Sequence, residues 1–340
     1  MATTTIPWND GSGDNIYLTY PSASGSQTVV VTSDANTGSV ERTKVVTFSA
    51  SANGQTVTKT LTLIQEKVAE QYIIFADPVV EQICATNWGD GVGLTPSQAA
   101  EVTNNDFGTT FRGNTSIVSF NELIYFTGLT SWGRNTFDGA SSLVSLTFPP
   151  NLTYFNQYTF RNNQALQELT FTRSLSAGGN NLVNGMGSLT RINIPNIESW
   201  ITNSWTGTSA PFSASPSSGL HVYINGQTSE LTTVTVPSTV TTIPQHTFRK
   251  WTAITSITFP STITSLGNYT CYQCSSLSQV VVKATTPPTL GTDVFRSNAS
   301  GRKIYVPYSA DHSVLANYKS SWSTYSSYIY ELNPDGTIPT

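Results

Sequence analysis

One leucine-rich phrase recurs along the chain at a fixed spacing of 23 residues, and this repeat restricts the possible folds more than any other feature. Its clearest form is Leu-x-x-Leu-x-Phe, and a second block keeps the same frame. Several columns that keep one register predict a stack of similar coils. The columns are Leu143, Leu166 and Leu189; Leu146, Leu169 and Ile192; Phe148, Phe171 and Ile194; then Leu231, Ile254 and Leu277; Val234, Ile257 and Val280; and Val236, Phe259 and Val282.

Each repeat predicts one short strand. Leu146 and Phe148 alternate with Thr147, which places apolar side chains on one face of the strand and a hydroxyl on the other. Pro149 then ends the strand. A single coil buries too little apolar surface to offset the entropy lost when it is ordered. We therefore expect a mainly β solenoid whose coils stabilise one another and whose two ends carry small helical caps.

An insertion separates the two blocks of repeats. Leu189 and Leu231 are 42 residues apart, so we expect extra chain at about 195–219. Long loops on a rigid scaffold often carry function, which makes the aromatic residues of the insertion candidates for binding a partner. The alternative is that the loop folds its tryptophans back onto the repeats. The candidates are Trp200, Trp205 and Phe212.

The outward face of the predicted strands is a second candidate surface. The repeat frame places Glu168 and Arg191 in one row and Asn193 in the next, so we expect these three side chains to contact a partner. The alternative is a plain solvated sheet, because faces that bind sugars usually present aromatic rings for stacking.

The repeats resemble a known family. The phrases at 141–149 and 236–248 are similar to the BspA-like leucine-rich repeat, and the similarity covers about 120–295. This resemblance implies adhesion and surface display rather than catalysis. Trp200 and the segment 221–226 match a long-insert variant of the family, and the stretch from Lys303 to Pro307 resembles the cap that closes such arrays. We therefore expect a solenoid over 120–295 and a C-terminal cap over 296–340.

Residues 1–68 have a different character. Runs rich in Val and Thr, separated by Gly, Asn and Ser turns, predict a small β-sandwich. Arg42, the strand that ends at Phe48 and the final run 61–65 resemble the BACON domain, an immunoglobulin-like module of gut Bacteroidales and their phages. The opening segment 6–17 resembles leader segments of phage virion proteins. Together these features resemble the virion proteins of crAss-like phages.

Residues 69–119 are expected to form a linker and a helical N-terminal cap. Asp77-Pro78 predicts a helix over 79–85, and the capping-box pattern at 95–98 predicts a second helix over 99–102. The loop at 87–98 resembles an EF-hand-like calcium loop, but only Asp90 offers a carboxylate and Gln98 stands where an acid is required. We therefore expect a cap over the first coil and no metal site.

The sequence offers no apparatus for catalysis. Cys271 and Cys274 occupy the repeat columns of Phe137 and Ala140, so core packing is expected for them rather than zinc or redox chemistry. The three histidines are scattered, and no nucleophile elbow or phosphate-binding glycine loop is present. We expect no catalytic, cofactor or metal site and no enzyme activity. Paired carboxylates that cleave glycosides remain open.

Composition limits the partners. With a net charge of −4 and only 16 Lys and Arg residues, the chain lacks the positive charge needed to bind nucleic acid. The longest apolar runs are far shorter than the roughly 20 residues that cross a bilayer, and the first ten residues lack the pattern of a secretion signal. We therefore expect neither nucleic-acid binding nor insertion into a membrane.

These features predict a non-enzymatic structural protein of a phage virion, in a head or tail fibre or decoration. The N-terminal domain would contact other virion proteins, the protein would form a homo-oligomer, and the repeats would attach to a host-surface glycan or protein. A bacterial cell-surface or secreted adhesin is the alternative. An accessory part of a carbohydrate-active enzyme is the third hypothesis.

Overall fold

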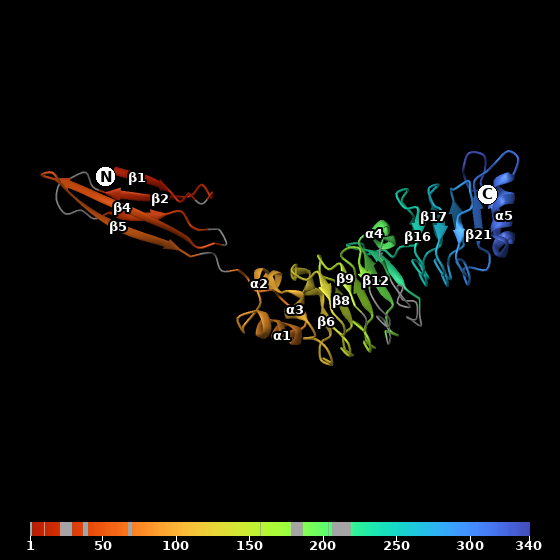
Figure 1. Cartoon of the computed structure of the whole chain (residues 1–340), viewed down its shortest axis with the longest axis horizontal. Helices are drawn as coiled ribbons and strands as arrows, with labels where there is room; N and C mark the ends of the chain where they lie inside the picture. The colour runs from red at the N-terminus through yellow and green to blue at the C-terminus, as the bar shows by residue number, and fades with distance from the viewer. Residues whose placement is uncertain are drawn as a thin grey trace. The chain divides into compact units, whose positions relative to one another are not determined.

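The computed structural model describes residues 2–9, 11–20, 29–36, 40–66, 70–156, 158–177, 186–202, 204–205 and 219–340 (Figure 1). The chain divides into two compact units, Met1–Gln71 and Tyr72–Thr340. Strands predominate in both units, and helices occur mainly at the two ends of the second unit. The fold is thus mostly β with few helices.

The first unit contains two antiparallel sheets, one in the order β1-β2-β3 and the other formed by the hairpin β4-β5. Asn53 and Gly54 connect the hairpin, and both have positive φ, as a two-residue hairpin turn requires. The strands are β1 (Ala2–Pro7), β2 (Asn15–Tyr20), β3 (Val30–Ser33), β4 (Arg42–Ala52) and β5 (Gln55–Gln65). The buried core consists of Trp8, Ile16, Leu18 and Val46.

Arg42 connects the two sheets of the first unit. Its buried guanidinium lies 4.7 Å from the ring centre of Trp8 and donates a 2.8 Å hydrogen bond from Nη1 to Oδ2 of Asp14. Its Nε donates to the side chain of Gln65 and its Nη2 to the carbonyl oxygen of Asp34. The arginine that the sequence resemblance singled out therefore holds β4 and β5 against the first sheet. The immunoglobulin-like fold and the relation to the BACON domain remain predictions.

Three short helices begin the second unit, and the sequence signals that start two of them are confirmed. Asp77 accepts a 2.8 Å hydrogen bond from the backbone N–H of Val79, and Thr95 and Gln98 form the predicted capping box. The first helix is longer than expected, because it continues to Trp88. The helices are α1 (Pro78–Trp88), α2 (Pro96–Glu101) and α3 (Asn104–Phe107).

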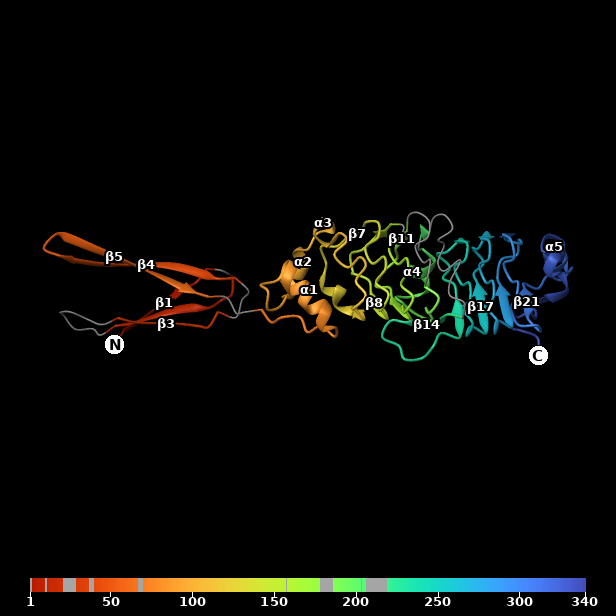
Figure 2. The same ribbon diagram turned by 90° about the horizontal axis from the view of Figure 1, so that it is seen from below.

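The first block of coils contributes strands to two parallel ladders that lie on opposite sides of the coils (Figure 2). The central strands pair in the register of the sequence repeat, so that Leu146 aligns with Leu169 and Leu169 with Ile192. One ladder contains β6 (Ser119–Phe120), β8 (Ser145–Thr147), β10 (Glu168–Thr170), β12 (Arg191–Ile194) and β14 (His221–Ile224). The other contains β7 (Ser131–Trp132), β9 (Tyr154–Phe155), β11 (Ser176–Ala177) and β13 (Ser204–Trp205), and a 3₁₀ turn, η1 (Asn121–Tyr125), follows β6.

The second block repeats this arrangement with two ladders of its own. The predicted columns of apolar residues are buried in both blocks, with the exception of Leu231, which is partly exposed where the second block begins. One ladder contains β15 (Thr233–Thr235), β17 (Ser256–Phe259), β19 (Gln279–Val282), β21 (Lys303–Val306) and β22 (Ile329–Glu331). The other contains β16 (Thr242–Ile243), β18 (Ser265–Leu266) and β20 (Thr289–Leu290).

A buried threonine fixes the turn in four of the described coils. The hydroxyl of Thr159 donates to the carbonyl oxygen of Asn156, three residues earlier, and the residue before this threonine has positive φ. The amide of Asn163 then donates a 3.0 Å hydrogen bond to the carbonyl oxygen of Ala140 in the preceding coil. These buried donors are therefore satisfied within their own coil or by the coil before it. The same threonine contact occurs at Thr136, Thr247 and Thr270.

The two blocks meet at the insertion. Strand β14 pairs with β12 across a step longer than one repeat, which aligns Ile192 with Val222, and β15 begins a new ladder shortly after β14. Helix α4 (Ile197–Ile201) lies within the insertion and follows the N-cap Asn196. Trp251 bridges the junction, because its backbone pairs with Leu220 and its ring lies 5.8 Å from that of Trp200.

The C-terminal cap closes the last coil with α5 (Ser313–Ser321) and the 3₁₀ helix η3 (Ser323–Tyr328). The hydroxyl of Tyr318 donates to the carbonyl oxygen of Ala284, and the indole of Trp322 donates to that of Pro288. Both rings are buried, so they cover apolar surface that the last coil would otherwise expose to water. No helix in the described ranges has the length and apolar character needed to cross a membrane.

Candidate functional site

Polar and aromatic side chains gather on the solvent-facing side of the ladder β8-β10-β12-β14. Parallel pairing aligns Glu168 with Arg191 and His221, and it aligns Asn193 with Tyr223. Residues aligned across neighbouring strands lie about 5 Å apart and face the same side. We call these five residues the ladder-face patch.

Arg191 is the centre of the ladder-face patch. Its Cζ lies 3.8 Å from the ring centre of Tyr223, which is the geometry of a stacked guanidinium. Its Nε lies 3.3 Å from Oε1 of Glu168 and donates a 3.2 Å hydrogen bond to Oδ1 of Asn193. One face and one nitrogen of the guanidinium are thus held by the protein. In the parts of the chain that the structure describes, neither terminal nitrogen of Arg191 has a hydrogen-bond partner.

Asn193 links the other members of the patch. Its Nδ2 donates to Oε1 of Glu168 at 2.6 Å and to Oγ1 of Thr170 at 2.8 Å. Asn193 is only 9% exposed, whereas Glu168 and Arg191 are substantially exposed. The amide of Asn193 therefore holds the carboxylate of Glu168 in place, while the charged groups of Glu168 and Arg191 remain accessible to a partner. Such a network reduces the entropy lost when a partner binds.

His221 forms the edge of the patch beside β12. Its Nδ1 lies 2.7 Å from Oε1 of Glu230, in the segment that leaves β14. The patch therefore combines one guanidinium, one imidazole, two carboxylates at or beside it and one aromatic ring. This combination suits oxygen acceptors such as carbonyl, carboxylate and hydroxyl groups, and it does not form the dense positive surface that a polyanion requires.

The family follows from the sequence of the repeats. Six copies of the pattern described as "BspA type Leucine rich repeat region" match residues 109–209 and 223–324. The chain belongs to the BspA-type leucine-rich repeat family. The leucine columns of this family build the ladders on which the patch lies. No match was found among the curated proteins.

Two solved structures of leucine-rich repeat proteins are similar in part. A leucine-rich cell surface protein from Faecalibacterium prausnitzii is 17% identical, with a TM-score of 0.32, over 52% of this chain and 43% of that chain. A leucine-rich repeat protein from Bacteroides ovatus is 16% identical, with a TM-score of 0.35, over 66% of this chain and 62% of that chain. The matched region thus spans less than two thirds of either protein.

The structure corrects the expectation for Trp200. This residue is 2% exposed, its indole donates a 2.7 Å hydrogen bond to the carbonyl oxygen of Thr247, and its ring packs edge-on against Phe171. Trp200 therefore belongs to the core of the BspA-type repeats, where burial of its large apolar ring is favourable, and it offers no face to a partner. Trp205 lies in β13, but its side chain is outside the described residues, as is the whole of Phe212.

The loop that resembles a calcium site is held by its own hydrogen bonds. Oδ1 of Asp90 accepts from the backbone N–H groups of Val92 and Gly93, and Oδ2 accepts from the hydroxyl of Tyr72. The Tyr72 hydroxyl, together with these N–H groups, lowers the pKa of Asp90 to about 2. Within the described ranges, no group of three or more His, Cys, Asp or Glu residues is placed to hold a metal ion.

The three thiols of this BspA-type protein are expected to be unreactive in the folded state. Cys84, Cys271 and Cys274 are buried and reduced, and Cys274 Sγ donates to the carbonyl oxygen of Phe248. Burial raises the pKa of Cys84 and Cys271, so little thiolate is available to react. We expect the thiol reagent DTNB to label none of the cysteines in native buffer and all three after unfolding. Rapid labelling without denaturant would contradict this packing.

Proposed function

We propose that this chain is an adhesive protein displayed at an outer surface, and that the ladder-face patch contacts a macromolecular partner. The observation that carries the proposal is Arg191, which Tyr223 and Glu168 hold in place while its terminal nitrogens have no partner among the described residues. A stacked array of repeats offers an extended surface, and this is how repeat proteins commonly bind large partners.

The patch favours a partner rich in oxygen acceptors. A fixed guanidinium can donate two parallel hydrogen bonds to a carboxylate or to neighbouring oxygens of a glycan. Glu168 balances its charge, so the partner need not be strongly acidic. A host-surface glycoprotein or glycan has this chemistry.

The carrier that displays the chain is a further part of the proposal. We infer that the carrier is a phage virion, with a bacterial cell surface as the alternative. On a virion, the first unit would contact other virion proteins and the chain would form a homo-oligomer. Mass spectrometry of purified particles and of proteins shaved from intact cells separates the two carriers. Recovery of the chain from neither fraction would contradict display.

Replacement of Arg191 tests the proposed contact. We expect Arg191→Ala to weaken binding of the full chain to immobilised mucin or to its glycan-array ligands by about tenfold or more, because a central arginine is a frequent hot spot. Arg191→Lys keeps the charge but loses the planar donors, so it should rescue binding only in part.

Lys283→Ala is the matched control, because it removes the same charge from an exposed position outside the patch. The control should bind like the unaltered chain. Melting temperatures of all three variants should remain close to that of the parent, because an exposed arginine pair contributes little stability. Unchanged binding of Arg191→Ala, or a parent chain that binds no surface, would overturn the proposed function.

A further inference from the structure

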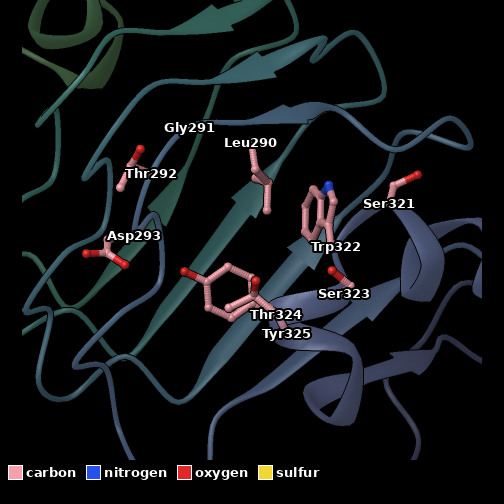
Figure 3. Close-up of a pocket in the computed structure, with 9 residues that line it drawn as sticks. All are labelled: Leu290, Gly291, Thr292, Asp293, Ser321, Trp322, Ser323, Thr324 and Tyr325. Carbon is pink, nitrogen blue, oxygen red and sulfur yellow. The ribbon is translucent and has the colours of Figure 1, made fainter.

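A hollow of about 350 Å³ lies where the last coil meets the C-terminal cap (Figure 3). Residues 290–293, from the end of β20 and the turn after it, form one wall, and residues 321–325, from the end of α5 and the start of η3, form the other. The volume is at the lower end of the roughly 300–1,000 Å³ typical of small-molecule sites. The hollow is separate from the ladder-face patch, since none of its residues belongs to β10, β12 or β14.

The apolar part of the hollow is rigid before any ligand arrives. Trp322 and Tyr325 are buried in its floor, and the indole nitrogen of Trp322 donates a 2.8 Å hydrogen bond to the carbonyl oxygen of Pro288. The hydroxyl oxygen of Tyr325 accepts from the backbone N–H of Phe295 at 3.1 Å. Leu290 lies beside the indole in Figure 3 and extends the apolar wall. Trp322 and Tyr325 are covered almost completely by the protein, so they support the wall from behind, and the partly exposed Leu290 is the apolar side chain that a ligand can contact.

The rim of the hollow is rich in hydroxyl groups. Thr292, Ser321, Ser323 and Thr324 are exposed, and their hydroxyls have no hydrogen-bond partner among the described residues. Asp293 adds a carboxylate whose Oδ2 accepts a 3.0 Å hydrogen bond from Nη1 of Arg296. Its Oδ1 has no such partner in the described ranges and can accept from a ligand hydroxyl.

Charge at the hollow selects against ions. Asp293 lines the hollow and Arg296 does not, so an anion in the hollow meets the carboxylate directly and is repelled, while the pairing of Asp293 with Arg296 weakens the attraction for a cation. Hydroxyl donors, a carboxylate acceptor and an apolar wall together match a pyranose ring, which has both C–H faces and hydroxyl edges. We propose that the hollow is a binding site for a neutral saccharide of one or two pyranose rings. This proposal goes beyond the proposed adhesion, and it supplies a ligand class that an adhesive array would use.

Ligand-observed saturation-transfer NMR on the full chain tests the site. The probes are the methyl glycosides of glucose, galactose, mannose and N-acetylglucosamine, with methyl glucuronide as the charged comparison. We expect at least one neutral glycoside to bind with a millimolar Kd and the glucuronide to bind at least tenfold more weakly. Competition by mucin oligosaccharides or by a bacterial capsular polysaccharide then separates the two natural sources of such rings.

Two variants localise the binding. Asp293→Asn should weaken it at least tenfold, and the variant should fold because Asn adopts the positive φ of this position as readily as Asp. Ser323→Tyr should abolish binding by filling the hollow from its exposed rim. Ser327→Ala, an exposed serine of η3 that does not line the hollow, is the control.

The outcomes separate this proposal from the adhesive one. The saccharide site would be overturned if no neutral glycoside at tens of millimolar received saturation from the protein. It would also be overturned if the Asp293→Asn variant transferred saturation as well as the parent does, or if the glucuronide bound as tightly as the neutral glycosides. Arg191→Ala should leave glycoside binding unchanged, because the ladder-face patch is not part of the hollow. Failure of the glycosides alongside intact mucin binding would therefore affect the saccharide site alone.

Discussion

Replacing Trp251 by alanine is expected to lower the free energy of unfolding by about 3 to 5 kcal/mol, which is the usual cost of truncating a buried tryptophan or phenylalanine. Trp251 is 1% exposed, and its ring lies 5.1 Å from that of Phe248 and 5.8 Å from that of Trp200. The cavity cannot close easily, because the backbone on each side is fixed by hydrogen bonds such as that from Leu220 N–H to the carbonyl oxygen of Lys250.

The effect of this substitution should include a loss of cooperativity. The strand ladders stop between β14 and β15, and isolated backbone contacts such as that of Leu220 with Trp251 replace a continuous ladder there, so side chains such as Trp251 carry much of the coupling between the blocks. Urea unfolding followed by circular dichroism should show a lower midpoint and a broader transition. Ile74→Ala, at a position that is 90% exposed, should change the free energy of unfolding by less than about 0.5 kcal/mol. A loss below about 1 kcal/mol for Trp251→Ala would argue against a packed junction.

Replacing Asp77 by alanine is expected to cost roughly 2 to 4 kcal/mol, because one carboxylate serves two structural elements. Its Oδ1 caps α1 by accepting from the backbone N–H groups of Val79 and Val80. Its Oδ2 accepts from the backbone N–H groups of Val118 and Ser119 at the start of β6. Alanine would leave these donors without a partner and would detach the helical cap from the first coil.

Asp77 also makes stability depend on pH. Burial raises the pKa of this carboxyl, but the hydrogen bonds from Val118, Ser119, Val79 and Val80 outweigh burial, and the pKa lies below its ordinary value. A lowered pKa in the folded state stabilises the fold above the unfolded pKa of about 3.9, and this contribution is lost as pH falls further. Asp77→Asn should therefore be less stable than the parent near neutral pH and should lose less stability between about pH 5 and pH 3. Urea titrations across this range measure both effects, and parallel pH profiles would contradict the assignment.

The sequence predicted the repeated fold well because one physical constraint generates it. A column such as Leu146, Leu169 and Ile192 has to face a common core, so apolar residues recur along the sequence at a nearly constant spacing. The signals at Asp77 and Thr95 were equally informative, because a cap is a local contact between residues close in sequence. Helices α3 and α4 were not anticipated, since each is short and packs through contacts with distant coils, and α5 was expected only as part of a helical cap at the C-terminal end.

The candidate site was predicted only in part. Glu168, Arg191 and Asn193 lie on one face as expected, because strand register follows directly from the period. Tyr223 was missed, because the step from β12 to β14 is longer than one repeat and hides its alignment with Asn193. The sequence allowed two places for Trp200, a contact loop and the core, and its burial together with its hydrogen bond to the distant residue Thr247 decides between them. Contacts between segments far apart in the chain carry this information, and a local pattern cannot supply it.

The coil-by-coil pairing of buried polar groups has an evolutionary consequence. Four of the described coils each carry their own turn-fixing threonine, and the Asn163 amide donates to a carbonyl of the neighbouring coil and reaches no further. A tandem duplication or deletion of one coil in the gene would therefore add or remove a complete set of contacts and would leave the two caps in place. The length of the repeat array, and with it the distance over which it reaches a target, can therefore change by one coil at a time while each coil keeps the same fold.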